Sequence, residues 1–168
     1  IPLAGSLLLT YYRRHKEDLS LQAHREVAHS SGHRDAVRVL DHLGYDFVEA
    51  ERNEHSFFKF KIGLRPKSCD AILTLGHLPL TSSMRIYFPD PIPLKRRPRI
   101  YEFSGRLNSF RGAGTFQLDH RNGLFYYFLD RDEFSSGAEM VDSIPELIYE
   151  AASAMEQALP DLIKRMYG

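Results

Sequence analysis

The 168-residue chain has little cysteine and no recognisable signature of catalysis. Its single cysteine, Cys69, excludes an internal disulfide framework and fits a reducing compartment. No internal repeat, low-complexity tract, glycine-rich phosphate loop, zinc finger or helix-turn-helix spacing is present. The formal net charge is zero, so no general attraction to polyanions follows. We therefore expect a protein that is not an enzyme and that holds no cofactor and no metal.

The composition is that of one packed domain. Apolar residues make up 43% of the chain, with 11 Phe and 9 Tyr, and 168 residues can bury a core without disulfides. The charges are unevenly distributed, because residues 59–111 hold 11 Lys or Arg against three acidic residues, a net of +8. Residues 112–168 hold four basic and ten acidic residues, a net of −6. Two such regions can attract each other within one molecule or between two copies.

Residues 1–32 read as an apolar N-terminal arm followed by a polar linker. Residues 1–12 are mostly apolar and end in Tyr11 and Tyr12, and basic residues follow within residues 13–16. That order is typical of the cytoplasmic end of a membrane span, although a 12-residue helix covers only about 18 Å of a hydrocarbon core of about 30 Å. We expect the arm to pack on the domain. The alternative is the end of a truncated membrane anchor, with membrane association through residues 1–16.

Three histidines near this linker raise the question of a metal site. His24, His29 and His33 are spaced i, i+5 and i+9, which does not place three imidazoles on one helical face. We therefore expect a solvated, histidine-rich segment and no metal ligands.

The remaining chain, residues 33–168, predicts helices and antiparallel strands. Apolar periodicity predicts helices over 33–43 and 100–110. Alternating apolar residues predict strands over 45–51, 56–62, 70–76, 83–88, 115–119 and 123–129. Asn53-Glu54 and Arg121-Asn122-Gly123 are expected as turns, and the proline-rich segment 89–98 as a long irregular connection.

The final helix carries its own start signal. Ser143 and Glu146 have the spacing of a capping box, and Pro145 is tolerated in a first helical turn. Pro160 should kink this helix or end its first half. The predicted fold class is α+β, an antiparallel sheet of about five to six strands packed by three helices.

This order of elements resembles the YbjN family, whose fold is like that of the type III secretion chaperones. The resemblance is carried by Leu107-Asn108, by the Gly114-x-Phe116-x-Leu118-Asp119 strand, and by the strand 123–129. Ala154–Leu159 before Pro160-Asp161-Leu162 completes the pattern. It covers residues 33–168, with its more specific part in 100–165, and the arginine-rich connection 89–99 is longer and more basic than the pattern needs.

The resemblance implies a small α+β domain of sensory or regulatory type, without a cofactor and without catalytic residues to carry over. Proteins of similar fold hold partly unfolded client segments or dimerise through a helix. A protein client or a homodimer is therefore the expected partner of residues 33–168, and the expected location is the cytoplasm, with a membrane tether as the alternative.

The aromatic hairpin is the first candidate for a contact surface. Phe125, Tyr126, Tyr127 and Phe128 are consecutive, so alternation sends two of them to each face of a sheet. Either Phe125 and Tyr127 or Tyr126 and Phe128 must lie away from the main core, unless helices cover both faces. Asn108 is a further candidate contact, although an asparagine at a helix end is more often a cap.

The basic connection is the second candidate. Lys95, Arg96, Arg97 and Arg99 form the densest charge run and could bind anionic groups. Cys69 and His77 could act as nucleophile and base, but an inert cysteine is the favoured interpretation. A carboxylate pair among residues 130–133 could act in catalysis or bind a metal, but a solvated strand end is favoured there.

Two function hypotheses follow. The leading one is a non-enzymatic protein-interaction module of chaperone-like or regulatory type. The alternative is a binder of anionic surfaces, membrane or nucleic acid, through residues 95–99 and the N-terminal arm, with nucleic acid the less favoured partner.

Overall fold

The computed structural model describes residues 31–110 and 113–168. One antiparallel sheet has the strand order β1-β2-β3-β4-β6-β5. Its strands are β1 (Phe47–Arg52), β2 (His55–Ile62), β3 (Cys69–His77), β4 (Leu80–Tyr87), β5 (Thr115–Leu118) and β6 (Phe125–Arg131). The helices are α2 (Ser31–His42), α3 (Arg97–Ser109), α4 (Gly137–Asp142) and α5 (Ile144–Tyr167), with a 3-10 turn, η1 (Leu94–Arg96), before α3. The predicted α+β class is confirmed, and the described residues form three long helices and the short α4, which was not expected from the sequence.

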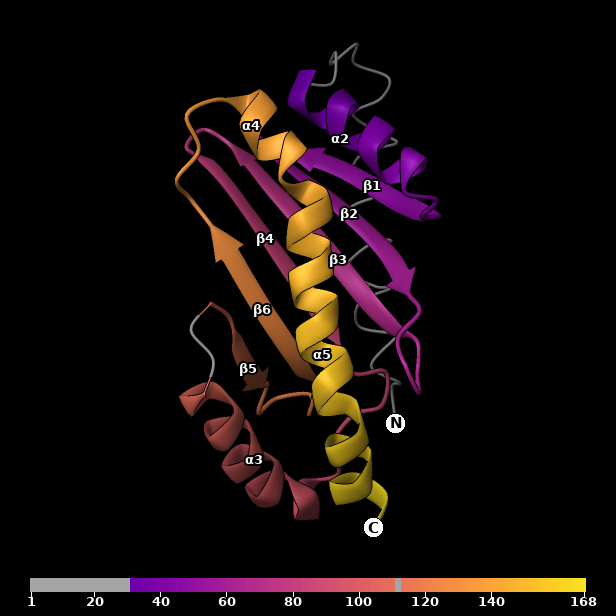
Figure 1. Ribbon diagram of the computed structural model, residues 1–168. Coiled ribbons are helices and arrows are strands. Elements are labelled where there is room, and N and C mark those ends of the chain that lie inside the picture. Colours follow the sequence, from indigo (N-terminus) through magenta and orange to yellow (C-terminus); the bar gives the residue numbers. More distant parts are fainter. Residues whose placement is uncertain (1–30, 111–112) are drawn as a thin grey trace.

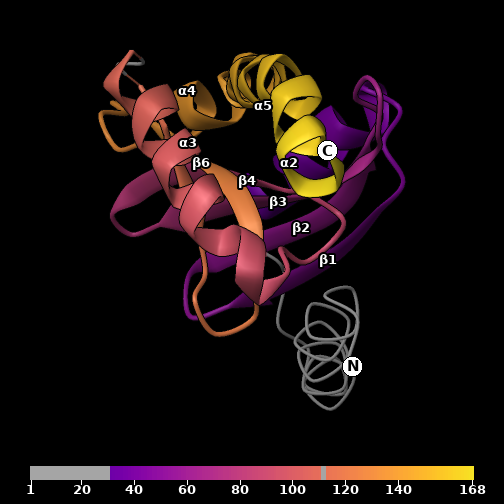
Figure 2. The same ribbon diagram turned by 90° about the horizontal axis from the view of Figure 1, so that it is seen from below.

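The described helices lie on one side of the sheet (Figure 2). The long helix α5 runs across the sheet, α2 and α4 lie together at one end, and α3 lies next to the short strand β5 (Figure 1). No helix among the described residues has the length and apolar character needed to cross a membrane. The expectations for the arm and linker concern residues 1–30, which lie outside the described residues.

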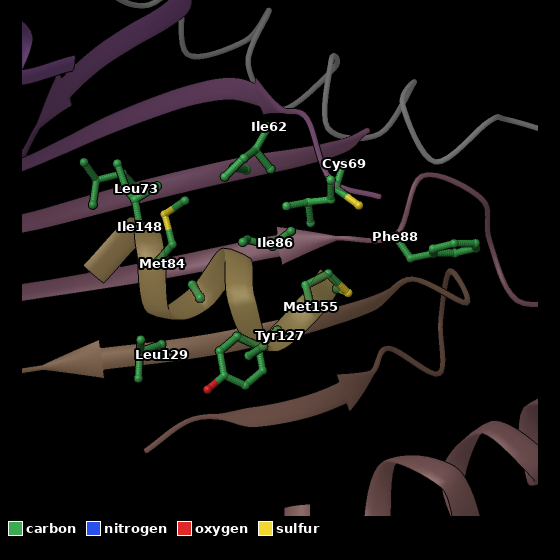
Figure 3. Packing of buried hydrophobic residues seen from close by; sticks show 14 of the residues in the cluster. Ile62, Cys69, Leu73, Met84, Ile86, Phe88, Tyr127, Leu129, Ile148 and Met155 are labelled. Atoms are coloured by element: carbon green, nitrogen blue, oxygen red, sulfur yellow. The ribbon is translucent and has the colours of Figure 1, made fainter. Parts of the chain in front are cut away.

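The core forms between α5 and the helix-facing side of the strands. On β2 the residues Phe58, Phe60 and Ile62 are buried at every second position, as strand alternation requires. The facing stripe of α5 is also buried, and it consists of Ile144, Leu147, Ile148, Ala151, Ala154, Met155, Ala158, Leu159, Leu162 and Met166. Figure 3 shows Ile148 and Met155 of α5 against the side chains of the sheet. Each large apolar side chain buried in this way stabilises the fold by about 1.5–3 kcal/mol.

The turns follow the predicted chemistry. Asn53 and Glu54 both have positive φ, 49° and 61°, and form the two-residue loop of the β1–β2 hairpin. Gly123 also has positive φ, 75°, in the β5–β6 connection, and its amide donates to Asp119 O at 2.8 Å. A Cβ at position 123 would lie 2.8 Å from Ile92 O, so only glycine fits. Both predicted hairpins are confirmed.

The predicted capping box at Ser143 is wrong. Ser143 already has helical dihedral angles, and its hydroxyl donates to Met140 O at 2.7 Å. The cap lies one helix earlier, where Ser136 Oγ accepts from Glu139 N at 3.1 Å and Glu139 accepts from Ser135 N. The S-x-x-E pattern occurs at Ser136, Ser143 and Ser153, and the first of these begins α4, which leads directly into α5.

Two predictions that concern prolines are corrected in part. The helix α5 continues through Pro160 to Tyr167, so the proline does not end its first half. The connection 89–98 is not irregular throughout, because η1 occupies Leu94–Arg96 and α3 begins at Arg97. Pro98 lies in the first turn of α3, where its missing N–H costs no helical hydrogen bond.

Candidate functional site

The sheet has a second face, opposite the helices, and aromatic residues gather on its β4–β6 part. Met84, Ile86 and Tyr127 point into the core, so their neighbours Arg85, Tyr87, Tyr126 and Phe128 point the other way. The strand register pairs Tyr87 with Tyr126 and Arg85 with Phe128. We call these four residues the aromatic strip. Its three rings are half-buried and its arginine is exposed.

The strip is held in place by its own contacts. The ring centroids of Tyr87 and Tyr126 are 5.1 Å apart, and the guanidinium carbon of Arg85 lies 5.1 Å from the centroid of Phe128. The Tyr126 hydroxyl donates to Gln117 Oε1 of β5 at 2.7 Å. Burial raises the pKa of Tyr87, an effect that Arg85 partly offsets, so its hydroxyl is neutral near pH 7. The strip therefore offers ordered rings, hydroxyl groups and one cation at a surface.

The structure divides the four predicted aromatic contacts into two pairs. Phe125 and Tyr127 are only 0% and 4% exposed, and both rings pack against Phe116. These two side chains belong to the core, and their place in the predicted contact set is corrected. Tyr126 and Phe128 lie on the second face and remain candidates. The sequence carried a signal for this outcome. The series of Phe125 and Tyr127 continues with the apolar Leu129, whereas the series of Tyr126 and Phe128 continues with the charged Asp130, so the first series is the one expected in the core.

Asn108 lies near the end of α3, and both polar groups of its side chain bind the backbone of Phe116. Phe116 N donates to Asn108 Oδ1 at 2.7 Å, and Asn108 Nδ2 donates to Phe116 O at 3.0 Å. The side chain therefore joins α3 to β5, and the predicted roles as helix cap and as partner contact are both replaced by this link.

The basic connection divides in a similar way. Arg97 Nε donates to Ile92 O at 3.1 Å and Arg97 Nη1 donates to His120 O at 2.8 Å, so this guanidinium ties the connection to the β5–β6 turn. Lys95 and Arg99 are exposed and Arg96 is half-buried at the start of α3. The first turn of α3 contains no acidic residue and its N-cap makes no side-chain hydrogen bond. Lys95, Arg96 and Arg99 remain candidates for anion binding, and Arg97 is a structural residue.

The structure does not bring Cys69 and His77 together. They lie at opposite ends of the nine-residue strand β3, about 26 Å apart at the usual rise of a strand. Burial raises the pKa of Cys69 to about 12, and the neighbouring Asp70 adds to this effect. Such a thiol stays protonated and is a poor nucleophile.

The carboxylates after β6 do not converge either. Asp130, Asp132 and Glu133 are exposed, while Arg131 turns to the helices and binds Glu150 at 2.7 Å. Among residues 31–110 and 113–168, no three His, Cys, Asp or Glu side chains form a group that could hold a metal ion.

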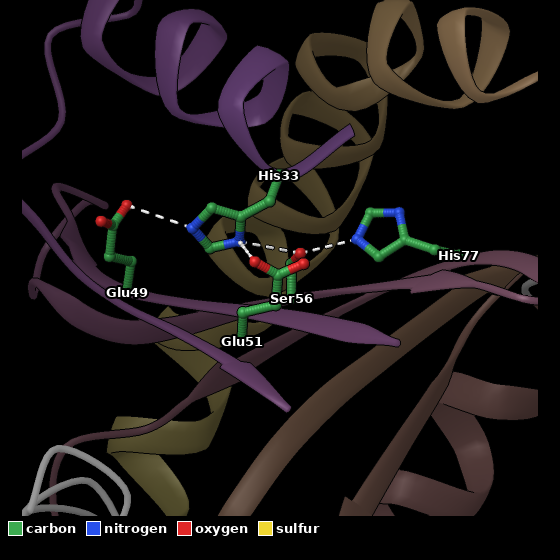
Figure 4. A network of polar contacts seen from close by, with 5 residues as sticks. All are labelled: His33, Glu49, Glu51, Ser56 and His77. Carbon is green, nitrogen blue, oxygen red and sulfur yellow. Dashed lines mark hydrogen bonds and ion pairs between the residues drawn. The ribbon is translucent and has the colours of Figure 1, made fainter. Parts of the chain in front are cut away.

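A buried polar network was missed by sequence reasoning. His33 is 1% exposed, in contrast to the solvated position expected for it, and Ser56 is fully buried beside it. Figure 4 shows these two residues with His77 and the carboxylates of Glu49 and Glu51. A signal was present, since His33 precedes Ala36, Val37 and Leu40 at helical spacing, and Ser56 belongs to the buried series of β2.

A small apolar hollow of about 280 Å³ lies between α2 and the α4–α5 junction. Its lining residues are Arg38, Val39, His42, Leu43, Val141, Asp142 and Pro145. Most of the surface that lines this hollow is apolar, so it lacks the convergent polar groups of an active site.

Comparisons with known proteins show a structural likeness and no sequence relative. No protein-family model matches the chain, and no curated protein sequence is similar to it. The crystal structure of YbjN, a candidate transcription regulator from E. coli, has a TM-score of 0.49 and 10% sequence identity to this chain. The likeness covers 77% of this chain and 93% of that one. It is a limited likeness in the arrangement of elements, so the fold class rests on the described strands and helices, and membership of the YbjN family stays a prediction.

Proposed function

We propose that the chain is a non-enzymatic protein-interaction module of chaperone-like or regulatory type, and that it binds its partner through the aromatic strip. The observation that supports this function is the strip itself. Tyr87, Tyr126 and Phe128 are ordered aromatic side chains on the face of the sheet that the described helices leave uncovered. Aromatic residues and arginine are the side chains that contribute most to protein–protein binding.

The geometry of the strip suits a protein segment better than a small molecule. A sheet surface is flat, and the four side chains form two adjacent cross-strand pairs instead of lining a hollow. Stacked rings lose little conformational freedom on binding, because their contacts already hold them. The Tyr126 hydroxyl and the Arg85 guanidinium can direct the partner through hydrogen bonds, while the rings bury apolar surface.

The test is affinity capture from the native lysate with the wild-type chain and a double variant, Tyr126→Ser with Phe128→Ser. Tyr149→Ser is the matched control, because Tyr149 is 72% exposed on α5, on the other side of the sheet. Circular dichroism and urea unfolding first establish that each variant is folded.

We expect one or a few proteins to be captured near stoichiometrically by the wild type and the Tyr149 variant, at low and high salt, and to be lost from the double variant. Equal capture by all three proteins would contradict the assignment of the strip. An empty capture from the wild type would count against a stable client, and sedimentation equilibrium would then test whether the strip joins two copies of the chain.

A second candidate function is supported by the start of α3. Lys95, Arg96 and Arg99 lie there without an acidic residue in the first helical turn, which favours binding of anionic groups. The experiment compares binding to vesicles with and without phosphatidylserine, and to a single-stranded oligonucleotide, in rising salt. Substituting Lys95→Ala and Arg96→Ala while keeping Arg97 should abolish binding if this surface is used, and Arg106→Ala on the same helix is the control. Binding that salt does not weaken would contradict a phosphate contact.

A further inference from the structure

Two histidines lie on either side of one buried serine hydroxyl, between α2 and the sheet (Figure 4). His33 is the third residue of α2, Ser56 belongs to β2 and His77 ends β3. His33 Nδ1 lies 2.9 Å from Ser56 Oγ, and His77 Nε2 lies 2.7 Å from the same oxygen. Because Ser56 is 0% and His33 1% exposed, water cannot readily replace these partners.

Two carboxylates of β1 face the nitrogens of His33. Glu49 Oε2 lies 3.5 Å from His33 Nε2, and Glu51 Oε2 lies 3.9 Å from His33 Nδ1. The strand register explains this arrangement, since Glu51 is paired with Ser56 and Glu49 with Phe58, all on the helix-facing side. A protonated His33 therefore has a carboxylate at ion-pair distance from each ring nitrogen.

The network attaches the first turn of α2 to the sheet. The His33 ring stacks on Phe58 with a centroid distance of 5.1 Å. The His77 ring lies directly against Gly32, where a Cβ would be 2.9 Å from His77 Cε1 and Nδ1. The first turn of α2 is thus held by one stacked ring and one hydrogen-bonded chain through Ser56.

The serine hydroxyl has only one proton, and this links the two rings. When His33 is neutral with its proton on Nε2, Ser56 donates to His33 Nδ1 and accepts from the Nε2–H of His77. When His33 takes a second proton, its Nδ1–H donates to Ser56, which then donates to a bare Nε2 of His77. The protonation of one ring therefore sets the tautomer that the other ring must adopt.

We propose that His33, Ser56 and His77 form a proton-coupled latch that holds the first turn of α2 on the sheet at neutral pH and loosens it in acid. The first proton, on His33, is balanced by Glu49 and Glu51. A second proton, on His77, places two positively charged rings next to the Ser56 hydroxyl. Neither ring can then accept the hydrogen bond that Ser56 donates. Burial lowers the pKa of His77, so the folded state resists this second proton.

Other charges around the latch act in both directions. Glu51 and Glu54 favour a proton on His77 and His55 disfavours it, all by less than burial does. On α2 itself, Arg34 and Asp35 follow His33, and the N-terminal end of the helix disfavours a cation there. From α4, Asp142 lies at the far end of α2 beside Arg38 and His42, and Pro145 of α5, which also lies there, carries no charge.

The test is an NMR titration of the histidine rings in the full chain between pH 4.5 and 8, with assignments from His33→Gln and His77→Gln. If the rings are coupled, the midpoint of His77 rises by about one pH unit in the His33→Gln variant, because the competing cation is gone. Glu49→Gln keeps both rings and should lower the midpoint of His33, which provides a second test if His33→Gln does not fold. His42→Gln, an exposed histidine at the end of the same helix, should change neither midpoint.

Hydrogen exchange then measures the latch itself. We expect protection of the amides of residues 35–38, which donate to the carbonyls of the first turn of α2, to fall at least severalfold, after correction for intrinsic rates, as pH drops through the His77 titration. The same amides should lose no protection in the His77→Gln variant. Unchanged midpoints in the ring titration would overturn the coupling, and protection that is independent of pH in the wild type would overturn the latch.

Discussion

Asn108 of α3 binds both backbone groups of Phe116 on β5, accepting from its N–H at 2.7 Å and donating to its carbonyl at 3.0 Å. The strand β5 is the edge of the sheet, with four residues and β6 as its one neighbouring strand among the described residues. An amide side chain therefore satisfies backbone groups that a further strand would otherwise pair. This protects the edge from pairing with another chain and fixes α3 beside it.

Replacing Asn108 by alanine should destabilise the fold, because the Phe116 N–H and carbonyl lose their partners in a half-buried position. We expect a loss of about 1–3 kcal/mol in the free energy of unfolding, measured by urea denaturation at pH 7.5. Ser109→Ala, which changes an exposed neighbour whose hydroxyl donates to Arg106 O, should cost less than about 0.5 kcal/mol. Equal losses of stability in the two variants would show that the hydrogen bonds between Asn108 and Phe116 contribute no more than an exposed side-chain hydrogen bond.

Two buried serines on the helix-facing side of the sheet should respond oppositely to alanine. Ser82 is 1% exposed and its hydroxyl has no hydrogen-bond partner among the described residues, so Ser82→Ala should stabilise the protein by about 1 kcal/mol. Ser56 is 0% exposed and joins two histidines, so Ser56→Ala should destabilise it by about 1–3 kcal/mol. Urea unfolding of both variants against the wild type measures the contrast, and a destabilising Ser82→Ala would indicate a partner for that hydroxyl.

Asp90 should make the stability of the fold depend on pH in the acid range. Its carboxylate accepts from Lys67 Nζ and, at 2.7 Å, from the Tyr167 hydroxyl, which joins the end of α5 to the β4–η1 connection. The Lys67 hydrogen bond, followed by that of Tyr167, lowers the pKa of Asp90. The contribution of ionised Asp90 to the free energy of unfolding is therefore present above the unfolded pKa of about 3.9. It is lost as pH falls through the lower pKa of the folded state.

Because Asp90 is 40% exposed, solvent screening limits this contribution to about 0.5–1 kcal/mol. Asp90→Asn should remove it at pH 7 and flatten the corresponding part of the stability curve below about pH 4. Asp35→Asn, which breaks an exposed ion pair within α2, is the control and should cost less. A wild-type curve that Asp90→Asn leaves unchanged would contradict the assignment.

Cys69 should resist thiol reagents in the folded protein. Its side chain is 1% exposed, so a reagent cannot reach the sulfur. Burial raises its pKa to about 12, so the thiol is not ionised to the reactive thiolate. We expect labelling by a maleimide at pH 7.5 to proceed at the rate of unfolding and to become fast in denaturing urea. Fast labelling without urea would show that the end of β3 opens readily, and it would revive a reactive role for this cysteine.

Much of the fold could be predicted because the relevant signals are local. Alternation located β2, β3, β4 and β6, and apolar periodicity located α2 and α3 to within a few residues at their starts. The short α4 was missed, since six residues carry too little periodicity. The cap was misplaced because the same S-x-x-E spacing occurs at Ser136 and Ser143, and only the packed structure shows which serine begins a helix.

The candidate sites were less predictable because they depend on which side chains meet. Asn108, Arg97 and the pair Phe125 and Tyr127 were all taken as candidates for contact, and the structure uses each of them internally. The structure also brings together His33, Ser56 and His77, which were not predicted to meet. His33 and Ser56 lie 23 positions apart along the chain, and Ser56 and His77 lie 21 positions apart.

The sequence by itself determined the succession of strands and helices, the positions of the tight turns and the two alternating series of side chains on each strand. These are consequences of backbone geometry and of neighbours within a few residues. Only the tertiary structure decided which series of β6 meets α5, which polar side chains replace missing backbone partners, and which histidines share one hydroxyl. Such contacts depend on strand order and register, because they join residues whose separation along the chain does not reveal their distance in space.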